Sequence, residues 1–421
     1  MAADTTIIDP WTVKSDKRIE YTKLIEHFGC SPIDTKLVNK FESITGEIAH
    51  PWIRRGLFFS HKDLDLVLDE FDSGKDIFLY TGRGPSSEAM HLGHMIPFQF
   101  TKWLQDVFDS PLVICMSDDE KFFFKDGILE DFNKLTYQNA RDIIACGFRL
   151  DKTFIYSNLE YMGGQLYSVT AKIMKSITGN QIRGIYGLNL DNNIGQLAWP
   201  PMQAAPAFYQ AFPDYIIPKN SRCLVSMAID QTPYFRMARD FANSHHDFIK
   251  PAEIHGKFLP ALSGTNAKMS SSTSDAGEKT IFMTDTRDDI IRKINKYSFS
   301  GGQDTIELHR KLGANLDIDI PYQYLCYFLS DDDKLETIAH RYAKGEMLSG
   351  EIKKIVADHI CDFVSQHQKN KSDISDQLLA KYFDKTRKLN FIKKKKNIID
   401  NSNYNKNYGI EFDLSFGHIF N

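Results

Sequence analysis

The stretch Ile77-Phe78-Leu79-Tyr80-Thr81-Gly82-Arg83-Gly84-Pro85 leads into His91-Leu92-Gly93-His94, and these residues decide the fold of the 421-residue chain. The apolar run 77–80 predicts a buried strand, which the glycine- and proline-containing turn brings to an end. Apolar spacing from residue 92 to residue 108 predicts a helix that begins at the histidines. A strand, a glycine turn and a helix N-terminus together indicate a site for phosphate oxygens, because free backbone N–H groups and the helix dipole both point at the ligand.

After residue 76, apolar runs alternate with helical patterns. The runs span residues 77–80, 112–116, 154–156 and 223–229. This alternation predicts an α/β fold, a parallel sheet with helices on both faces and a ligand crevice at the carboxyl ends of the strands. Tyr80, Ser117–Glu120 and Asp230–Gln231 come where these strands are expected to end. We therefore expect them to line one crevice.

A second motif, Lys268-Met269-Ser270-Ser271-Ser272, lies in a small, hydroxyl-rich loop. A lysine on such a loop is suited to clamp the outer phosphates of a nucleotide. His91 and His94 are three residues apart on one helix face, so both imidazoles can reach the same triphosphate. Neither motif is specific alone, but together and in this order they predict one nucleotide site.

The composition limits which classes of protein are possible. The chain has 51 basic and 55 acidic residues and a net charge of −4, which argues against a general polyanion binder. Any nucleic-acid partner must then be held by local patches and shape. Hydrophobic residues make up 42% of the chain, enough for sizeable cores, and the length indicates two or three domains.

The cysteines and the N-terminus bear on location. Six scattered cysteines without a C-x-x-C pair are typical of reduced core thiols, and no cluster has metal-ligand spacing. Residues 1–6 lack the features of a signal or transit peptide. No apolar run approaches the ~18 residues of a membrane span. We expect a cytosolic protein that has no membrane partner.

From about residue 285 the pattern changes to successive amphipathic helices, expected at 288–297, 305–312, 322–329, 333–343 and 351–366. We expect four parts: an appended N-terminal segment (1–75), the strand-and-helix domain (76–285), an α-helical domain (286–391) and a Lys/Asn-rich tail (392–421). The Lys393–Lys396 run in the tail is either a solvated segment or a nucleic-acid contact.

The two motifs resemble the H-I-G-H and K-M-S-K-S signatures with which class I aminoacyl-tRNA synthetases bind ATP. Further matching stretches lie at residues 80–90, 117–121, 202–206, 228–231 and 233–236. From about residue 8 to 391 the chain is similar to the eukaryotic and archaeal type of tryptophanyl-tRNA synthetase. The resemblance implies a Rossmann-like parallel-sheet catalytic domain with a helical insertion, a C-terminal all-α anticodon-binding domain, and a homodimer with one tRNA(Trp) spanning both subunits.

The resemblance also implies roles for individual residues. His91, His94 and Lys268 would be catalytic. ATP would be bound by Thr81, Gly82, Arg83, His91, Gly93, His94, Lys268, Met269, Ser270, Ser271 and Ser272. L-tryptophan would be bound by Tyr80, Glu120, Lys121, Gln203 and Gln231, and anticodon bases by Phe299, Asp304 and Lys353. Mg²⁺ would arrive with ATP.

The chemistry of the implied reaction fits these residue types. The carboxylate of the amino acid attacks the α-phosphorus of ATP and releases pyrophosphate. Because a carboxylate is already a nucleophile, catalysis needs positioning and charge stabilisation rather than an acid–base pair.

The chain departs from the family pattern at two positions. Ser272 stands where the signature often ends in lysine, a variation that is usual in the tryptophanyl type. Cys115 stands where the family usually has a glutamine that accepts a hydrogen bond from the indole N–H. Because a thiol is a weak acceptor, either Tyr80 alone suffices, or a water or Ser117 helps, or selectivity is relaxed.

Two alternative functions stay open from the sequence. A tyrosine–tRNA ligase shares the fold and both signatures, but its pocket would need a carboxylate against the phenol hydroxyl. A catalytically silent relative that acts as a binding protein is disfavoured by the intact His91, His94 and Lys268.

Overall fold

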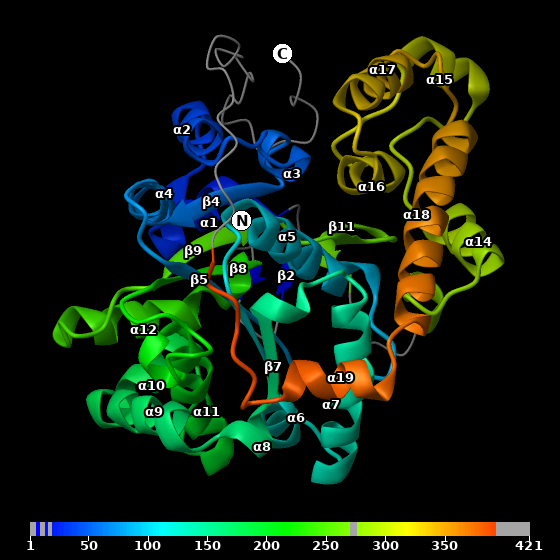
Figure 1. The fold of residues 1–421 in the computed structure, drawn as a ribbon. Coiled ribbons are helices and arrows are strands. Elements are labelled where there is room, and N and C mark those ends of the chain that lie inside the picture. Colours follow the sequence, from blue (N-terminus) through cyan, green and yellow to red (C-terminus); the bar gives the residue numbers. More distant parts are fainter. Residues whose placement is uncertain (1–5, 9–12, 16–18, 270–275, 393–421) are drawn as a thin grey trace.

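A computed structural model of the chain describes residues 6–8, 13–15, 19–269 and 276–392, and gives side chains for all of these except 6–8, 13–15, 265–268 and 276. The main sheet has seven strands in the order β3–β4–β9–β8–β5–β6–β7 (Figure 1). Their bounds are β3 Ser31–Pro32, β4 Phe58–Lys62, β5 Ile77–Arg83, β6 Leu112–Met116, β7 Thr153–Ser157, β8 Arg222–Ala228 and β9 Ala252–Gly256.

Five neighbouring strands, β9, β8, β5, β6 and β7, are parallel, as the alternating pattern predicts. From β5 the chain continues to β6 and β7 on one side of β5, then returns to β8 on the other side. The order of the strands therefore reverses between β5 and β8, which is where ligands bind in sheets of this kind. One strand of this set, β9, was not among the predicted runs. Its sequence, Ala-Glu-Ile-His-Gly, is fully buried although it contains two ionisable residues.

The helices fall into groups around this sheet. N-terminal to β5 lie α1 Tyr21–Phe28, α2 Thr35–Thr45, α3 Pro51–Arg54 and α4 Leu64–Asp72. Between β5 and β9 lie α5 Leu92–Phe108, α6 Asp118–Phe124, α7 Leu129–Ile144, α8 Asn158–Tyr161, α9 Gly164–Ser176, α10 Gly179–Tyr186, α11 Ile194–Ala204 and α12 Thr232–Ser244. C-terminal to the sheet lie α13 Ala276–Lys279, α14 Arg287–Tyr297, α15 Ile306–Leu312, α16 Ile320–Phe328, α17 Asp332–Ala343, α18 Ser349–Ser372 and α19 Asp376–Phe383.

Alternation along the strands divides the core into two clusters, because successive side chains of a strand point to opposite faces. Leu79 and Ile114 lie in a cluster with α2, α4, α5 and the C-terminal helices. Tyr80, Cys115 and Tyr156 lie in a second cluster, which packs against α9, α11 and α12. The two faces of the sheet are thus covered by different parts of the chain.

The N-terminal segment that the sequence analysis treats as appended supplies β3 and β4 to the main sheet. Both are antiparallel, β4 pairing with β9 and β3 with β4, so these two strands differ from the expected parallel pattern. A small second sheet joins β1 Thr6–Ile8 and β2 Val13–Ser15 to β11 Gly264–Lys268 and β10 Pro260–Ala261. The N-terminal segment is therefore built into both sheets.

The C-terminal helices α14–α18 form an all-helical group beside the sheet (Figure 1). Their apolar side chains, among them Tyr327 and Val364, belong to the same cluster as Trp52 and Leu79. Trp52 Nε1 also donates to the Tyr327 backbone oxygen at 2.9 Å. The helical group and the sheet thus share a continuous core.

None of the six cysteines, all of which lie in the described part, forms a disulfide, and five are buried. No helix in the described part is long and apolar enough to cross a membrane.

Candidate active site

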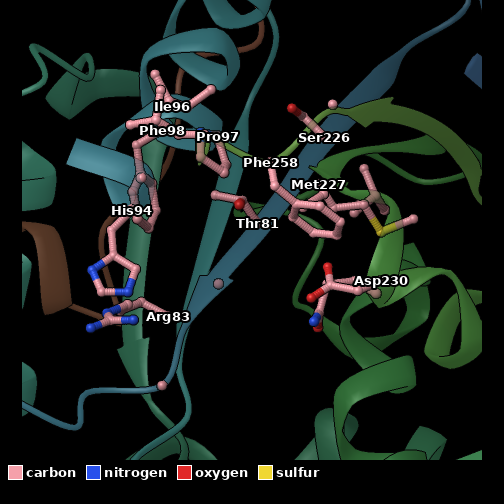
Figure 2. A pocket seen from close by; sticks show the side chains of 18 of the residues that line it. Thr81, Arg83, His94, Ile96, Pro97, Phe98, Ser226, Met227, Asp230 and Phe258 are labelled. Carbon is pink, nitrogen blue, oxygen red and sulfur yellow. The ribbon is translucent and has the colours of Figure 1, made fainter. Parts of the chain in front are cut away.

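A cavity of about 340 Å³ opens at the carboxyl ends of β5 and β8, where the strand order reverses. Residues from both predicted motifs and from the expected amino-acid pocket line it together: Tyr80, Thr81, Gly82, Arg83, His91, Gly93, His94, Lys121, Gln203, Gln231 and Met269. Figure 2 shows Arg83 and His94 on one side of this cavity and Asp230 on the other. The predicted convergence on one crevice is thus found for Tyr80, Asp230 and Gln231, whereas Ser117–Glu120 are not among the lining residues, which include only their neighbour Lys121 from this stretch.

His91 and His94 lie at the first turn of α5, where His91 is the N-cap residue. The two imidazole rings stack with centroids 3.5 Å apart, and His94 Nδ1 accepts from the His91 backbone N–H at 3.3 Å. This start of the helix is tied to residues downstream of the second motif, since Leu92 N donates to the Ile281 oxygen at 3.1 Å. Two imidazoles and the N-terminus of a helix therefore face one cavity, an arrangement suited to phosphate oxygens.

Arg83, the last residue of β5, brings a half-buried cation to the cavity. Burial lowers the pKa of its guanidinium to about 10, with Glu120 and Asp142 acting in the opposite direction, so the group stays charged at neutral pH. Its Nε donates to Asn139 Oδ1 of α7 at 3.2 Å, and Nη2 has no hydrogen-bond partner among the described residues. A buried, charged nitrogen with an unused donor is suited to an anionic ligand.

Tyr80 lies inside β5 rather than at its end, because the strand continues to Arg83. Its side chain is 1% exposed, and its hydroxyl donates to the Gln203 backbone oxygen at 3.2 Å. Burial raises the pKa of Tyr80 well above its ordinary value, so the hydroxyl stays neutral. Because its proton is used on Gln203, the lone pairs of the Tyr80 oxygen stay available to accept a hydrogen bond.

Glu120 is not among the residues that line the cavity, and its side chain is held by its neighbours in the chain. Ser117 Oγ donates to one carboxylate oxygen at 2.8 Å, and Lys121 Nζ donates to the other at 3.0 Å. Burial raises the pKa of the adjacent Asp119 to about 7. The Glu120 carboxylate can therefore hold an ammonium group only by adding to, or exchanging, its contact with Lys121.

The second motif is only partly described. Lys268 ends β11, with its backbone paired to Pro260, and its side chain lies outside the described residues. Met269 lines the cavity, and its N–H donates to the Leu259 oxygen at 2.9 Å. Ser270, Ser271 and Ser272 lie outside the described residues.

The expected anticodon residues do not line the cavity; they lie among the C-terminal helices. Phe299 is 47% exposed and follows α14, and Asp304 is exposed before α15. Lys353 of α18 donates to the Asn295 oxygen at 3.1 Å, four residues before Phe299. Burial lowers the pKa of Lys353, while the charge of Asp319 acts to raise it.

Several residues that the sequence analysis missed also build the site. Lys257 and Phe258 line the cavity after β9, and Asn139 orients Arg83. No sequence motif indicates these residues. The preceding strand, β9, contains polar side chains that are paired only in the folded chain. Ser60 Oγ and His255 Nδ1 are 3.0 Å apart, and His255 Nε2 and Glu253 Oε2 are 3.0 Å apart. No group of three or more potential metal ligands occurs in the described part of the chain.

Comparison with known proteins defines the class. The model of the family "tRNA synthetases class I (W and Y)" matches residues 72–365. A crystal structure described as a parasite tRNA synthetase with bound product superposes with a TM-score of 0.84 at 49% identity, covering 88% of this chain and 97% of that one. The fold and the cavity are therefore those of a class I tRNA synthetase.

Individual relatives narrow the family further. The cytoplasmic tryptophan–tRNA ligase of Oryctolagus cuniculus is 50% identical over 89% of this chain and 79% of its own length. The tryptophanyl-tRNA synthetase structure from Plasmodium falciparum has a TM-score of 0.81 at 47% identity, covering 88% of this chain and 96% of that one. The chain belongs to the eukaryotic type of tryptophanyl-tRNA synthetases.

Proposed function

We propose that this chain is a tryptophan–tRNA ligase, which activates L-tryptophan with ATP to tryptophanyl-adenylate and transfers the tryptophanyl group to the 3′ end of tRNA(Trp). The observation that carries this proposal is the convergence of His91, His94, Arg83 and Met269 with Tyr80, Gln203 and Gln231 around one cavity. A nucleotide site and an amino-acid pocket that share one cavity allow the two substrates to meet.

The ATP side of the cavity would act by charge stabilisation. His91, His94 and the N-terminus of α5 would hold phosphate oxygens, and the unused donor of Arg83 would stabilise charge near the reacting phosphate. Gly93 would keep this approach open: a Cβ there would stand 3.1 Å from His91 Cε1. Lys268 would neutralise charge on the pyrophosphate as it leaves, Ser270, Ser271 and Ser272 would help to bind ATP, and Mg²⁺ would arrive bound to ATP.

The amino-acid side would orient the carboxylate for attack. Gln203 and Gln231, which line the cavity, together with Glu120 would bind the α-ammonium group, and Lys121 would reach the carboxylate. Tyr80 would accept the indole N–H with the lone pairs that its bond to Gln203 leaves free. No proton transfer is needed in this step, since the attacking carboxylate is ionised at neutral pH.

We propose the further division of roles along the chain as follows. Residues 76–285 would carry activation, residues 286–391 would read the anticodon through Phe299, Asp304 and Lys353, and residues 1–75 would complete the sheets. The tail, 392–421, stays open between a solvated segment and a tRNA contact. Salt dependence of tRNA affinity with and without residues 393–421 separates the two, because lost phosphate contacts flatten it.

A homodimer in the cytosol completes the proposal. Exposed apolar side chains between β7 and β8 support a subunit interface, among them Leu190 (97% exposed), Ile194 (78%) and Tyr167 (54%). Light scattering should give the mass of two chains rather than the 48.3 kDa of one. The names of the relatives support a cytosolic location, which imaging of a tagged chain would test.

Charging of tRNA tests the proposal as a whole. The full-length chain, with ATP and Mg²⁺, should esterify tryptophan to a tRNA(Trp) transcript and should leave a tRNA(Tyr) transcript uncharged with either amino acid. Tyrosine belongs in the test because Asp230, a carboxylate that a tyrosine pocket would need, lines the cavity. Charging of tRNA(Tyr) with tyrosine would instead establish the tyrosine ligase, and charging of neither would favour the silent relative.

A further inference from the structure

Cys115, which replaces the glutamine usual in the family, is a poor acceptor for the indole in this structure. Its thiol donates to Asn158 Oδ1 at 3.4 Å, and Asn158 Nδ2 in turn donates to Asp119 Oδ1 at 3.1 Å. The proton of the thiol is thus directed away from the cavity, and the sulfur that is left accepts hydrogen bonds only weakly. A substitute for the family's second acceptor of the indole N–H must therefore be a residue other than Cys115.

A row of residues leads from Gly82, in the wall of the cavity, to Cys115 and then to Tyr156, neither of which lines the cavity. Gly82 lines the cavity, and a Cβ on it would stand 3.6 Å from Cys115 Cβ and 3.1 Å from the Cys115 backbone oxygen. Cys115 pairs with Gly82 on β5 and with Tyr156 on β7, so the three residues form one row across the sheet. Tyr80 lies two residues before Gly82 and faces the same side. The row therefore continues the indole pocket that starts at Tyr80.

The Tyr156 hydroxyl is buried at the end of this row. The side chain is 2% exposed, and among the described residues its hydroxyl has no hydrogen-bond partner other than the Cys115 thiol, which is a weak one. Its ring is fixed by Tyr161 and Phe212, whose centroids lie 5.0 and 5.9 Å away. Burial raises the pKa of Tyr156 well above its ordinary value, and the polar groups that act on it most strongly after burial are Cys115 and Tyr80. The hydroxyl is thus neutral and lies near Cys115 and Tyr80.

We propose that Tyr156 is a specificity-determining residue for tryptophan, whose hydroxyl accepts the indole N–H together with Tyr80 in place of the missing glutamine carboxamide. This inference rests on the proposed function and deepens it. Neighbouring strands are about 4.8 Å apart, so a tyrosine side chain on β7 is long enough to extend over the short Cys115 toward β5. A cysteine at position 115 and a tyrosine at position 156 are then complementary, because a long side chain at 115 would occupy the space that the hydroxyl needs.

The energetic cost of burying the Tyr156 hydroxyl in the protein without substrate is a separate argument that Tyr156 recognises tryptophan. A buried hydroxyl whose only partner is a thiol is poorly satisfied, and phenylalanine would fill the same apolar site without that cost. A hydrogen bond that forms only when tryptophan binds accounts for keeping the tyrosine. Substrates that lack the N–H donor would be disfavoured, since they leave the hydroxyls of Tyr80 and Tyr156 without this hydrogen bond.

The test compares tryptophan with its sulfur isostere 3-(benzothiophen-3-yl)alanine, which has the same shape but no N–H donor. In ATP–pyrophosphate exchange, Tyr156→Phe should lower kcat/KM for tryptophan by about three- to tenfold, the effect of one neutral hydrogen bond. The same variant should leave the inhibition constant of the isostere unchanged. Tyr161→Phe, which removes a half-buried hydroxyl from the neighbouring ring, is the matched control and should change neither value.

Two further measurements separate recognition from structure. Tyr156→Phe should unfold at the same temperature as the wild type or a higher one, because it removes a poorly satisfied buried hydroxyl. Cys115→Gln in the Tyr156→Phe background should restore kcat/KM for tryptophan. An equal change for tryptophan and the isostere, or no change for either, overturns the inference. Absence of tryptophan-dependent exchange in the wild-type chain would instead contradict the proposed function itself.

Discussion

Burial of single side chains decides how the site behaves at the residue scale. Asp119 is 6% exposed, accepts from Asn158 Nδ2 at 3.1 Å and from the Glu120 N–H at 2.8 Å, and lies near the carboxylates of Asp118 and Glu120. Burial raises its pKa to about 7, and the two neighbouring carboxylates act in the same direction. The folded chain therefore holds a proton on Asp119 up to about neutral pH, whereas the unfolded chain releases it near pH 4.

This difference predicts a pH dependence of stability. Between about pH 4 and 7 the unfolded state binds fewer protons at this site, so the free energy of unfolding falls as pH rises, by at most about 1.4 kcal/mol per pH unit. Asp119→Asn keeps the shape and does not titrate. In urea unfolding at one protein concentration, the variant should therefore gain stability over the wild type progressively from pH 5 to 7, with no further gain above. A difference that is independent of pH would show that Asp119 is already ionised in the folded chain.

Individual residues also show which parts of the site could be predicted from sequence and which could not. The motif residues His91, His94 and Gly93 were predicted to meet the amino-acid pocket, because each lies in a local pattern that fixes its place after a strand. Asn139 and Tyr156 were not predicted. Their roles arise from contacts between elements that are distant in sequence, and no local spacing encodes such contacts.

At the scale of elements, α18 connects two parts of the molecule. This helix has 24 residues, and so a length of roughly 36 Å, and runs past the sheet in Figure 1. Near its C-terminal end, His367 Nε2 lies 3.1 Å from Asp142 Oδ1 of α7, and Lys371 Nζ lies 2.9 Å from Asp142 Oδ2. Asp142 is 1% exposed and its charge also acts on Arg83. A buried carboxylate thus anchors α18 beside the helix that orients Arg83.

Removal of this carboxylate should be far more costly than removal of an exposed carboxylate on α19 that also pairs with α7. Asp142→Ala leaves the partner charge of Lys371 poorly compensated and should lower the free energy of unfolding by about 3–5 kcal/mol. The control is Asp376→Ala, which breaks the contact of a 94% exposed carboxylate with Arg141 of α7 and should lower it by less than about 1 kcal/mol. Denaturant unfolding of both variants checks this. Similar small losses would mean that apolar packing alone holds α18.

Periodic elements were predictable from sequence, and tertiary ones were not. The amphipathic pattern predicted a helix at 333–343, and α17 spans Asp332–Ala343. The pattern for 351–366 gave the middle of α18 but not its last turn, where contacts with Asp142 hold the helix. β9 was missed because Glu253 and His255 break the apolar pattern and are paired only in the folded chain. Hydrophobic periodicity does not encode such pairing.

At the scale of the whole molecule, the sheet places the two substrates. The reversal of strand order between β5 and β8 opens the cavity, α5 brings the histidines to it, and the face packed on α9, α11 and α12 would carry the proposed indole pocket. The helical group α14–α18 shares a core with the other face. The proposed division into one part for amino-acid activation and another for tRNA recognition follows this arrangement.

ATP–pyrophosphate exchange with each of the twenty amino acids in turn tests the central claim most directly, since it needs neither tRNA nor the anticodon contacts. The full-length chain should exchange with tryptophan, far more weakly with tyrosine, and at background with the other eighteen. Faster exchange with tyrosine, or none with any amino acid while the chain is folded, would contradict the account.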